Sequence, residues 1–482
     1  MAPEIILLVF PLILAVLSWG IPSNRFRSYL LPLGGLVHLS LSLHGFIYPA
    51  ATPLTPYLGL DAPARLVLPG VSLLFFLCSL YAVGYLKEHS QRSNRVFCSS
   101  MLAFLSMMSL VAYARHLGLM WVAIEATTLT TAPLIYFNYN PKSIEATWKY
   151  LLICSVGIAL ALLGTFFLAY ATMGQETETS LFLSDLLKNA PHLSKPWLHA
   201  AFILLLVGYG TKMGLAPMHT WKPDAYGEAS GLVGALLAGG LTQCAFLAIF
   251  RIYWICKAAG EGLYAGRFLI LMGLVSMAMA AVFIIHQRDF KRMLAYSSVE
   301  HMGILSLGLG LGGISTYGSL LHLMNNGLTK GLLFLAAGNI AHAYGGKTLE
   351  NVRGAIRRLP LSGTLFLLGF IAITGSPPFG PFISEFLILN GAFHRGYLWV
   401  GGLYLLFLLV VFMGMGSTVL GVVQGKSMKS TGGNSPSYRE SLWTGIPLVF
   451  LILLILLLGL YIPNTLNTRI MEAAHCLEQT YD

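Results

Sequence analysis

The sequence contains few charged residues and no long polar stretch. Only 10% of its 482 residues are charged, whereas 56% are hydrophobic; an ordinary soluble domain carries about 25% charged residues. Apolar runs of about twenty residues, the length that a helix needs to cross the hydrocarbon core of a bilayer, recur along the chain. The composition therefore predicts an all-α, polytopic membrane protein with one transmembrane domain over 1–482. The continuous run 442–461 excludes a transmembrane β-barrel, which needs short alternating segments.

Motifs that bind metals or cofactors are missing as well. The six cysteines contain no C-x-x-C pair, and several lie inside apolar runs, so neither metal ligation nor a disulfide framework is expected. The sequence has no glycine-rich nucleotide fingerprint and no haem-attachment motif. Its net charge of +10 is not gathered into a basic patch interleaved with aromatics, which argues against a nucleic-acid partner. We expect no cofactor, no metal and no redox centre in this chain, and a lipid bilayer around it.

Fourteen segments are predicted to span the membrane. In chain order they are 4–20, 28–48, 66–86, 98–114, 117–137, 146–172, 198–216 with a continuation after Pro223, 230–256, 267–286, 294–311, 315–343, 361–393, 397–423 and 442–462. Lysine and arginine are concentrated in the loops after odd-numbered segments. These loop charges include Arg25, Arg27, Lys87, Arg92, Arg95, Lys142, Lys222, Arg288, Lys291, Arg292, Lys347, Arg353, Arg357 and Arg358. By the positive-inside rule, this bias places those loops in the cytoplasm and both termini outside.

Two of these segments contain residues that interrupt a helix. The seventh carries Gly214 and Pro217 in "GYGTKMGLAPMHTW", and the twelfth carries Pro377 and Pro378 in "TGSPPFGPFISEF". Proline removes a backbone donor and clashes with the preceding turn, so both helices are predicted to be discontinuous. Irregular backbone at membrane depth is tolerated only against protein or a water-filled cavity.

The two predicted breaks lie five segments apart. Breaks at corresponding places of two halves are typical of transporters built from inverted repeats. We therefore predict two five-helix repeats of opposite orientation. The first covers 98–260 (fourth to eighth segments), and the second covers 267–425 (ninth to thirteenth segments).

A few ionisable residues fall inside the apolar segments. They are Glu125, Lys212, Lys330 and Glu385. A charged side chain at the bilayer centre costs at least about 2.5 kcal/mol, so each is a functional candidate. The alternative is a set of buried ion pairs that only hold the bundle together. His322, Asn326 and Lys330 recur at every fourth position and share one helix face as a polar stripe.

Other polar residues are predicted to be secondary relay groups or structural residues. They are Lys149, His219, Asp224, Glu228, His301 and Asn326. His301, like His322, could be a structural histidine hydrogen-bonded between helices, and Lys149 could extend to the membrane surface as an anchor. Asp224 and Glu228 could cap helix ends near the junction of the seventh and eighth segments.

These residue types favour proton transfer. Burial in a medium of low dielectric makes a lysine release its proton more readily and makes a glutamate hold its proton more firmly, whereas bringing the two together favours both charged forms. Such coupled groups titrate as a unit. A chain of Glu125, Lys212, His322 and Lys330 linked by hydroxyls and water would be a proton relay gated by the Glu–Lys distance. The non-transport alternative is a static scaffold.

Six strings of the sequence carry a resemblance to a known family. They are "WVAIEATTLTTAPL", "ATWKYLLICSVGIALALLGTFFL", "GYGTKMGLAPMHTWKPDAYGEA", "RDFKRMLAYSSVEHMGI", "HLMNNGLTKGLLFLAAGNI" and "GSPPFGPFISEF". With them, the chain resembles the antiporter-like membrane subunits shared by respiratory complex I, multisubunit cation/proton antiporters and energy-converting membrane hydrogenases. The resemblance covers nearly the whole length and is most specific over 117–390. The strings "IEATTLTT" and "WKYLLICSVGIALALLGT" are most similar to the F subunit of hydrogenase-4-type complexes.

The resemblance implies fourteen core helices, two inverted repeats and a central hydrophilic axis. Glu125 matches the family's fifth-helix glutamate, and Lys212 matches the seventh-helix lysine paired with it. Lys330 matches the eleventh-helix lysine, and Glu385 occupies the exit position of the twelfth helix.

Two positions depart from common forms of the family. Gln243 stands where many members carry lysine or histidine to connect the two half-channels. Glutamine cannot titrate, but it can orient a water between Lys212 and Lys330. Asn326 stands where relatives often have a second histidine.

The resemblance also implies a function. It indicates a non-catalytic, proton-translocating subunit of a redox-driven membrane complex, of hydrogenase-4/formate hydrogenlyase or complex I type, in the plasma membrane of a prokaryote. The implied partners are other membrane subunits and soluble redox subunits that carry the metal centres. A Na⁺/H⁺ antiporter module and a subunit that couples the proton gradient to inorganic-carbon uptake are the alternatives.

Overall fold

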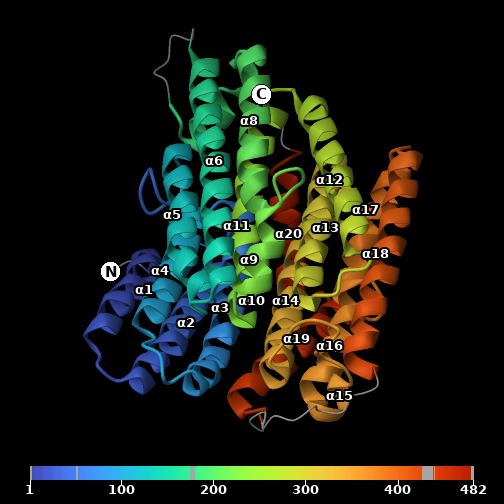
Figure 1. Ribbon diagram of the computed structural model, residues 1–482. Helices are drawn as coiled ribbons and strands as arrows, with labels where there is room; N and C mark the ends of the chain where they lie inside the picture. Colours follow the sequence, from blue (N-terminus) through green and yellow to red (C-terminus); the bar gives the residue numbers. More distant parts are fainter. Residues whose placement is uncertain (1–2, 50–52, 174–179, 426–437, 439, 479–482) are drawn as a thin grey trace.

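The protein is a bundle of long helices. The computed structural model describes residues 3–49, 53–173, 180–425, 438 and 440–478, and within these ranges it contains isolated β-bridges but no strand. The long helices run side by side along one direction (Figure 1). Nine helices of the described ranges are long and apolar enough to cross a membrane. The prediction of an all-α, polytopic membrane protein is therefore confirmed.

Each predicted segment coincides with a helix or with consecutive part-helices. In chain order these are α1 (Pro3–Gly20), α2 (Asn24–Ile47), α3 (Ala62–Glu88), α4 (Arg95–Tyr113), α5 (Leu117–Tyr136), α6 (Pro141–Thr172), α8 (Lys195–Met213) with α9 (Trp221–Glu228), α10 (Gly231–Leu236) with η2 (Leu237–Leu241) and α11 (Thr242–Ala258), α12 (Gly262–Ile284), α13 (Phe290–Leu311), α14 (Ile314–Tyr344), α16 (Pro360–Ile373) with α17 (Gly380–His394), α18 (Leu398–Gln424) and α19 (Leu442–Leu460). The short elements α7 (Leu183–Lys188), η1 (Ala190–His192) and α15 (Ala355–Arg358) lie between them, and α20 (Asn464–His475) follows. The number of fourteen spans stays a prediction.

Both predicted helix breaks are present. The helix α8 ends at Met213, Gly214 takes the left-handed conformation with φ of 86°, and α9 begins seven residues later. The helix α16 ends at Ile373, Gly375 has φ of 66°, and α17 begins at Gly380. A left-handed residue after the last turn is a common helix end, and glycine adopts it without a steric penalty. The Ala216–Pro217 and Pro377–Pro378 peptide bonds are cis.

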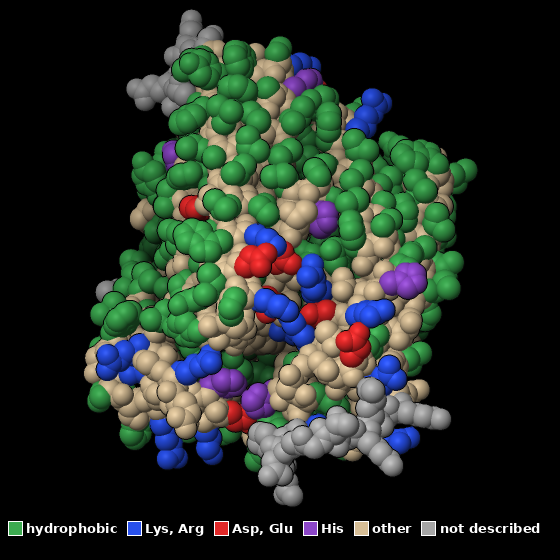
Figure 2. Space-filling view, in the orientation of Figure 1, with side chains coloured by type: hydrophobic (Ala, Val, Ile, Leu, Met, Phe, Trp, Pro, Cys, Tyr) green, Lys and Arg blue, Asp and Glu red, His purple; other side chains and the backbone are tan. Residues whose placement is uncertain are grey.

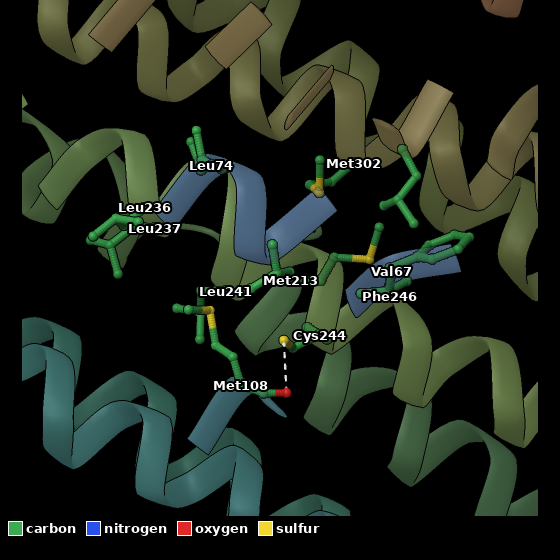
Figure 3. Close-up of a cluster of buried hydrophobic side chains, with 14 of the residues drawn as sticks. Val67, Leu74, Met108, Met213, Leu236, Leu237, Leu241, Cys244, Phe246 and Met302 are labelled. Carbon is green, nitrogen blue, oxygen red and sulfur yellow. Dashed lines mark hydrogen bonds between the residues drawn. The ribbon is translucent and has the colours of Figure 1, made fainter. Parts of the chain in front are cut away.

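The centre of the bundle is apolar where α10, η2 and α11 pass through it. The most apolar part of this segment is completely buried. Figure 3 shows a cluster of hydrophobic side chains around η2, among them Met108, Met213, Leu241 and Met302. Because these four residues come from α4, α8, η2 and α13, the cluster joins helices of the earlier and later parts of the chain.

One buried arginine has a structural role that the sequence pattern did not reveal. Arg251 of α11 donates to Asp61 Oδ2 at 2.8 Å and to the carbonyl oxygens of Val111 (2.9 Å) and Ala112 (2.7 Å). A cation is favoured beside the free carbonyls at a helix C-terminus. The arginine thereby ties α11 to the end of α4 and the start of α3.

Candidate functional site

Lys212 lies in the last turn of α8 and is buried. Its Nζ donates to the Thr128 hydroxyl at 2.5 Å and to the Tyr150 hydroxyl at 3.0 Å, and it lies 4.9 Å from the centre of the Tyr150 ring. Thr128 in turn donates to Glu125 Oε2 at 3.0 Å. The predicted pairing of Glu125 with Lys212 is therefore present as a bridge through a hydroxyl, and the two charges are not in direct contact.

Glu125 lies at the edge of the bundle between α5 and α6. It is only partly buried, and its Oε1 accepts a hydrogen bond at 3.3 Å from Ser155, which is exposed. Tyr150 extends the polar contacts inward, because its hydroxyl lies 2.7 Å from the Thr131 hydroxyl. Glu125, Thr128, Lys212 and Tyr150 form the first part of a polar chain that runs from the bundle edge to the first helix break.

The predicted loop position of Lys222 is wrong. The sequence analysis counted it among the cytoplasmic loop charges, but it is completely buried in α9. Its Nζ donates to the Ser298 hydroxyl of α13 at 3.2 Å and lies 5.7 Å from the centre of the Tyr226 ring. It also lies against Gly214: a Cβ atom at Gly214 would stand 2.7 Å from Lys222 Nζ. The turn after α8 folds the start of α9 back into the bundle, and this return was not predicted.

Lys330 lies in the middle of α14 and is buried. Its Nζ donates to the Ser297 hydroxyl at 2.7 Å and approaches the Leu294 carbonyl oxygen at 3.4 Å. Ser297 and Ser298 are consecutive residues of α13, so one turn of this helix supplies hydroxyls to both Lys330 and Lys222. The sequence analysis missed both serines, although the polar run "YSSVEH" inside an apolar segment was a usable signal.

Two histidines and a glutamate meet beyond Lys330. His301 Nδ1 lies 3.0 Å from His322 Nε2 and 3.8 Å from Glu385 Oε1, and His322 Nδ1 lies 2.9 Å from the Ser384 hydroxyl. Glu300, which the site prediction omitted, is buried, with its Oε2 4.0 Å from His301 Nε2. Glu385 comes from beyond the second break and lies against Gly375, as Lys222 lies against Gly214.

The same group has the composition of a possible metal site. The ligand atoms of His301, His322 and Glu385 lie within 4.8 Å of one another. Imidazole nitrogens with a carboxylate oxygen suit Zn²⁺ and related transition metals. The same types of side chain also exchange protons through direct contacts.

The two unusual amides of the sequence are both buried. Gln243 donates from Nε2 to the Leu323 carbonyl oxygen at 3.4 Å, and its amide nitrogen lies against Gly327. Asn326 lies between His322 and Lys330 along α14, and its side-chain amide has no hydrogen-bond partner among the described residues. Buried amides generally have partners. The polar stripe predicted on α14 is therefore buried inside the bundle.

Several secondary candidates form a charged network around the outer side of α9. Asp224 pairs with Lys149 (3.0 Å) and Arg292 (3.1 Å), and Glu228 pairs with Lys347 (2.7 Å). The helix-cap interpretation of Asp224 and Glu228 is therefore wrong, because α9 has no side-chain cap of this kind.

Figure 2 shows basic and acidic side chains gathered in the middle of the face drawn, below a surface covered by hydrophobic side chains.

His219 also lies in the first break. It is buried, and its ring centre stands 6.5 Å from that of Tyr296. It has no contact with Lys212 or Lys330 in the hydrogen bonds and ion pairs of the described residues.

Comparison with known proteins gives a consistent result. The family described as NADH:quinone oxidoreductase/Mrp antiporter, TM, matches residues 114–409. The hydrogenase-4 component F homolog of Methylacidiphilum infernorum is 34% identical over 480 residues, which cover 97% of this chain and 98% of that relative.

Two solved structures have a similar fold. A chain of respiratory complex I from Thermus thermophilus has a TM-score of 0.77 and 28% identity, with 95% of this chain and 97% of that chain covered. A chain of the Mrp complex from Dietzia sp. has a TM-score of 0.86 over 100% of this chain and 99% of that chain, and at 20% identity it is evidence for the fold alone.

The hydroxyl bridge between Glu125 and Lys212 is open to a direct test. Thr128→Val keeps the branched shape but removes the hydroxyl, so Lys212 loses an acceptor and Glu125 loses a donor. We expect the free energy of unfolding to fall by about 1–3 kcal/mol, measured by denaturant unfolding of the purified protein in detergent.

Thr130→Val on the same helix is the matched control. The Thr130 hydroxyl donates to the Ala126 carbonyl oxygen of its own helix at 2.9 Å and joins no charged group. We expect a change of at most about 0.5 kcal/mol. Equal losses in the two variants would contradict the bridge.

Proposed function

The chain belongs to the NADH:quinone oxidoreductase/Mrp antiporter transmembrane family, and from this premise we propose that it is the proton-translocating, antiporter-like subunit of a redox-driven membrane complex. The hydrogenase-4 component F homolog, which matches over almost its full length, favours a complex of the hydrogenase-4 type. The partners are then other membrane subunits and soluble subunits that carry the redox centres. The subunit itself moves protons and does not catalyse the redox reaction.

One observation carries the proposal: the buried lysines are held by hydroxyls. Lys212 donates to Thr128 and Tyr150, and Lys330 donates to Ser297. Among the described residues, neither lysine forms an ion pair with a carboxylate. A lysine with neutral partners can release its proton without leaving a buried carboxylate unpaired, an event that would cost several kcal/mol. This arrangement suits groups that change protonation state during a cycle better than fixed structural ion pairs.

The described contacts define two parts of the proposed proton path. The first part enters at Glu125 and passes through Thr128 to Lys212. The second part begins at Lys330, and Asn326 and Gln243 are buried amides beside the path. It leaves through the group of His301, His322 and Glu385. The side-chain amide of Asn326 has no hydrogen-bond partner among the described residues, so both of its polar atoms can bind water. Bound water of this kind links polar groups in a proton relay.

The inverted repeats over 98–260 and 267–425 are part of the same proposal. Its support is the parallel between the two breaks: each half-helix ends at a left-handed glycine, and a charged side chain from beyond the break lies against that glycine. Inverted repeats with discontinuous helices are a common transporter architecture. Failure of the two units to superpose after inversion in an experimental structure would contradict it.

We place the protein in the plasma membrane of a prokaryote with both termini on the outer side. The support is the concentration of lysine and arginine in the loops after odd-numbered segments, which survives the removal of Lys222 from that set. We expect a reporter enzyme that is active only outside the cytoplasm to be active when fused to the C-terminus. Activity only after fusion to the loop near Arg288 would reverse this topology.

The central proposal predicts the behaviour of Lys330→Met. The variant keeps the apolar stem and removes the amine, so proton transfer through the second half is interrupted. In the native complex, isolated through a tag on this subunit and reconstituted in vesicles, we expect redox-driven proton uptake to fall about a hundredfold. Proton uptake is measured with a pH-sensitive dye.

Lys188→Met, an exposed lysine in α7, is the control and is expected to leave pumping unchanged. Full pumping by Lys330→Met would contradict the proposal. Sodium-dependent proton exchange without any redox substrate would assign the chain to the alternative Na⁺/H⁺ antiporter class instead.

A further inference from the structure

The polar chain described above has a gap between Lys212 and Lys330. The two lysines lie on α8 and α14, and no hydrogen bond among the described residues joins their side-chain networks. Gln243 does not close the gap: its Nε2 donates to the Leu323 carbonyl oxygen, and the hydrogen bonds of the described residues include none from Gln243 to either lysine. A proton that crosses between the halves therefore needs a different route.

Lys222 occupies the position that such a route requires. Its Nζ lies against Gly214, two residues after Lys212, and its only described hydrogen bond is donated to Ser298 of α13. Ser297 precedes Ser298 on α13, and its hydroxyl accepts a hydrogen bond from Lys330 Nζ. Lys222 thus reaches from the end of α8 to the turn of α13 that holds Lys330.

The surroundings of Lys222 fit a group that carries charge transiently. It is completely buried, and no carboxylate among the described residues pairs with it. Its cationic form is stabilised by the face of Tyr226. Gly214 has no side chain and adopts a left-handed conformation, so the break itself provides the space for the lysine.

The second break contains a matching arrangement. Glu385 lies against Gly375 in the same way and contacts the histidine pair. At each break, therefore, an ionisable side chain lies against the left-handed glycine and contacts a polar group of α13. Lys222 contacts Ser298, and Glu385 contacts His301. This places Lys222, and not only Lys212, in correspondence with Glu385.

We propose that Lys222 is the proton-carrying link between Lys212 and Lys330. The Lys222 amine accepts a proton to become an ammonium group on one side and releases it toward the Ser298 and Ser297 hydroxyls on the other. The link replaces a titratable group at position 243, where the chain has glutamine. This inference rests on the proposed function, and its test is chosen so that the two can fail separately.

The test compares substitutions at position 222 in the reconstituted native complex. Lys222→Met removes the amine, and we expect redox-driven proton uptake to fall about a hundredfold. Lys222→Arg keeps a positive charge and hydrogen-bond donors, but a guanidinium group does not release its proton, so we expect a similar loss. Lys222→His supplies a group that titrates near neutral pH and is expected to restore part of the uptake.

Controls separate the role of Lys222 from the rest of the path. Lys142→Met changes an exposed lysine on α6 and is expected to pump normally. If Lys330→Met abolishes pumping while Lys222→Met pumps normally, the link is wrong and the proposed function stands. If both variants pump normally, the proposed function is wrong as well. Normal pumping by Lys222→Arg would show that position 222 needs only a fixed charge and would overturn the inference.

A second variant covers the case in which substitutions at Lys222 prevent assembly. Ser298→Ala removes one hydroxyl from α13 without changing any charge. We expect about tenfold slower proton uptake, the effect of losing one favourable hydrogen bond on the path, together with normal assembly. Unchanged uptake in Ser298→Ala would contradict the link through this hydroxyl.

Discussion

The arrangement of the bundle depends on the cost of keeping lysine ammonium groups away from water. A charge at membrane depth is expensive unless polar groups replace the lost solvent. Each of the three buried lysines on the path therefore has a hydroxyl from a neighbouring helix: Thr128 for Lys212, Ser298 for Lys222 and Ser297 for Lys330. Hydroxyls stabilise the charged form and can also donate to the neutral amine. Partners of this kind let each lysine hold or release a proton without rearranging the helices around it.

The two helix breaks and the apolar centre follow from the same constraint. A continuous helix would turn the groups beyond residue 214 or 375 away from the bundle, whereas a left-handed glycine lets the chain fold back. Lys222 and Glu385 return to the interior in this way. The side chains around η2, by contrast, form an apolar cluster that contains methionines and leucines (Figure 3). The route that we propose passes along α13, where consecutive serines accept hydrogen bonds from Lys222 and Lys330.

The sequence predicted the parts of this site that contrast with their surroundings. Glu125, Lys212, Lys330 and Glu385 were recognisable because they interrupt apolar segments, and glycine and proline marked both breaks. Lys222 was not recognisable, because "TWKPDAYGE" is polar enough to be interpreted as a loop and only the turn at Gly214 brings it inside. The bridge through Thr128 was also beyond the sequence, since it depends on how a hydroxyl of α5 is oriented toward α8. Asp224 was misjudged as a cap because its partners lie on other helices.

The central claim is that both halves form one continuous proton path. The most direct test measures redox-driven proton uptake in the reconstituted complex for Lys212→Met, Glu385→Gln and the double variant. A single path predicts that each single variant abolishes uptake and that the double variant has no further effect, because groups that act in series are strongly non-additive. Two independent half-channels would instead leave about half of the uptake in each single variant and none in the double variant, a result that would contradict the account.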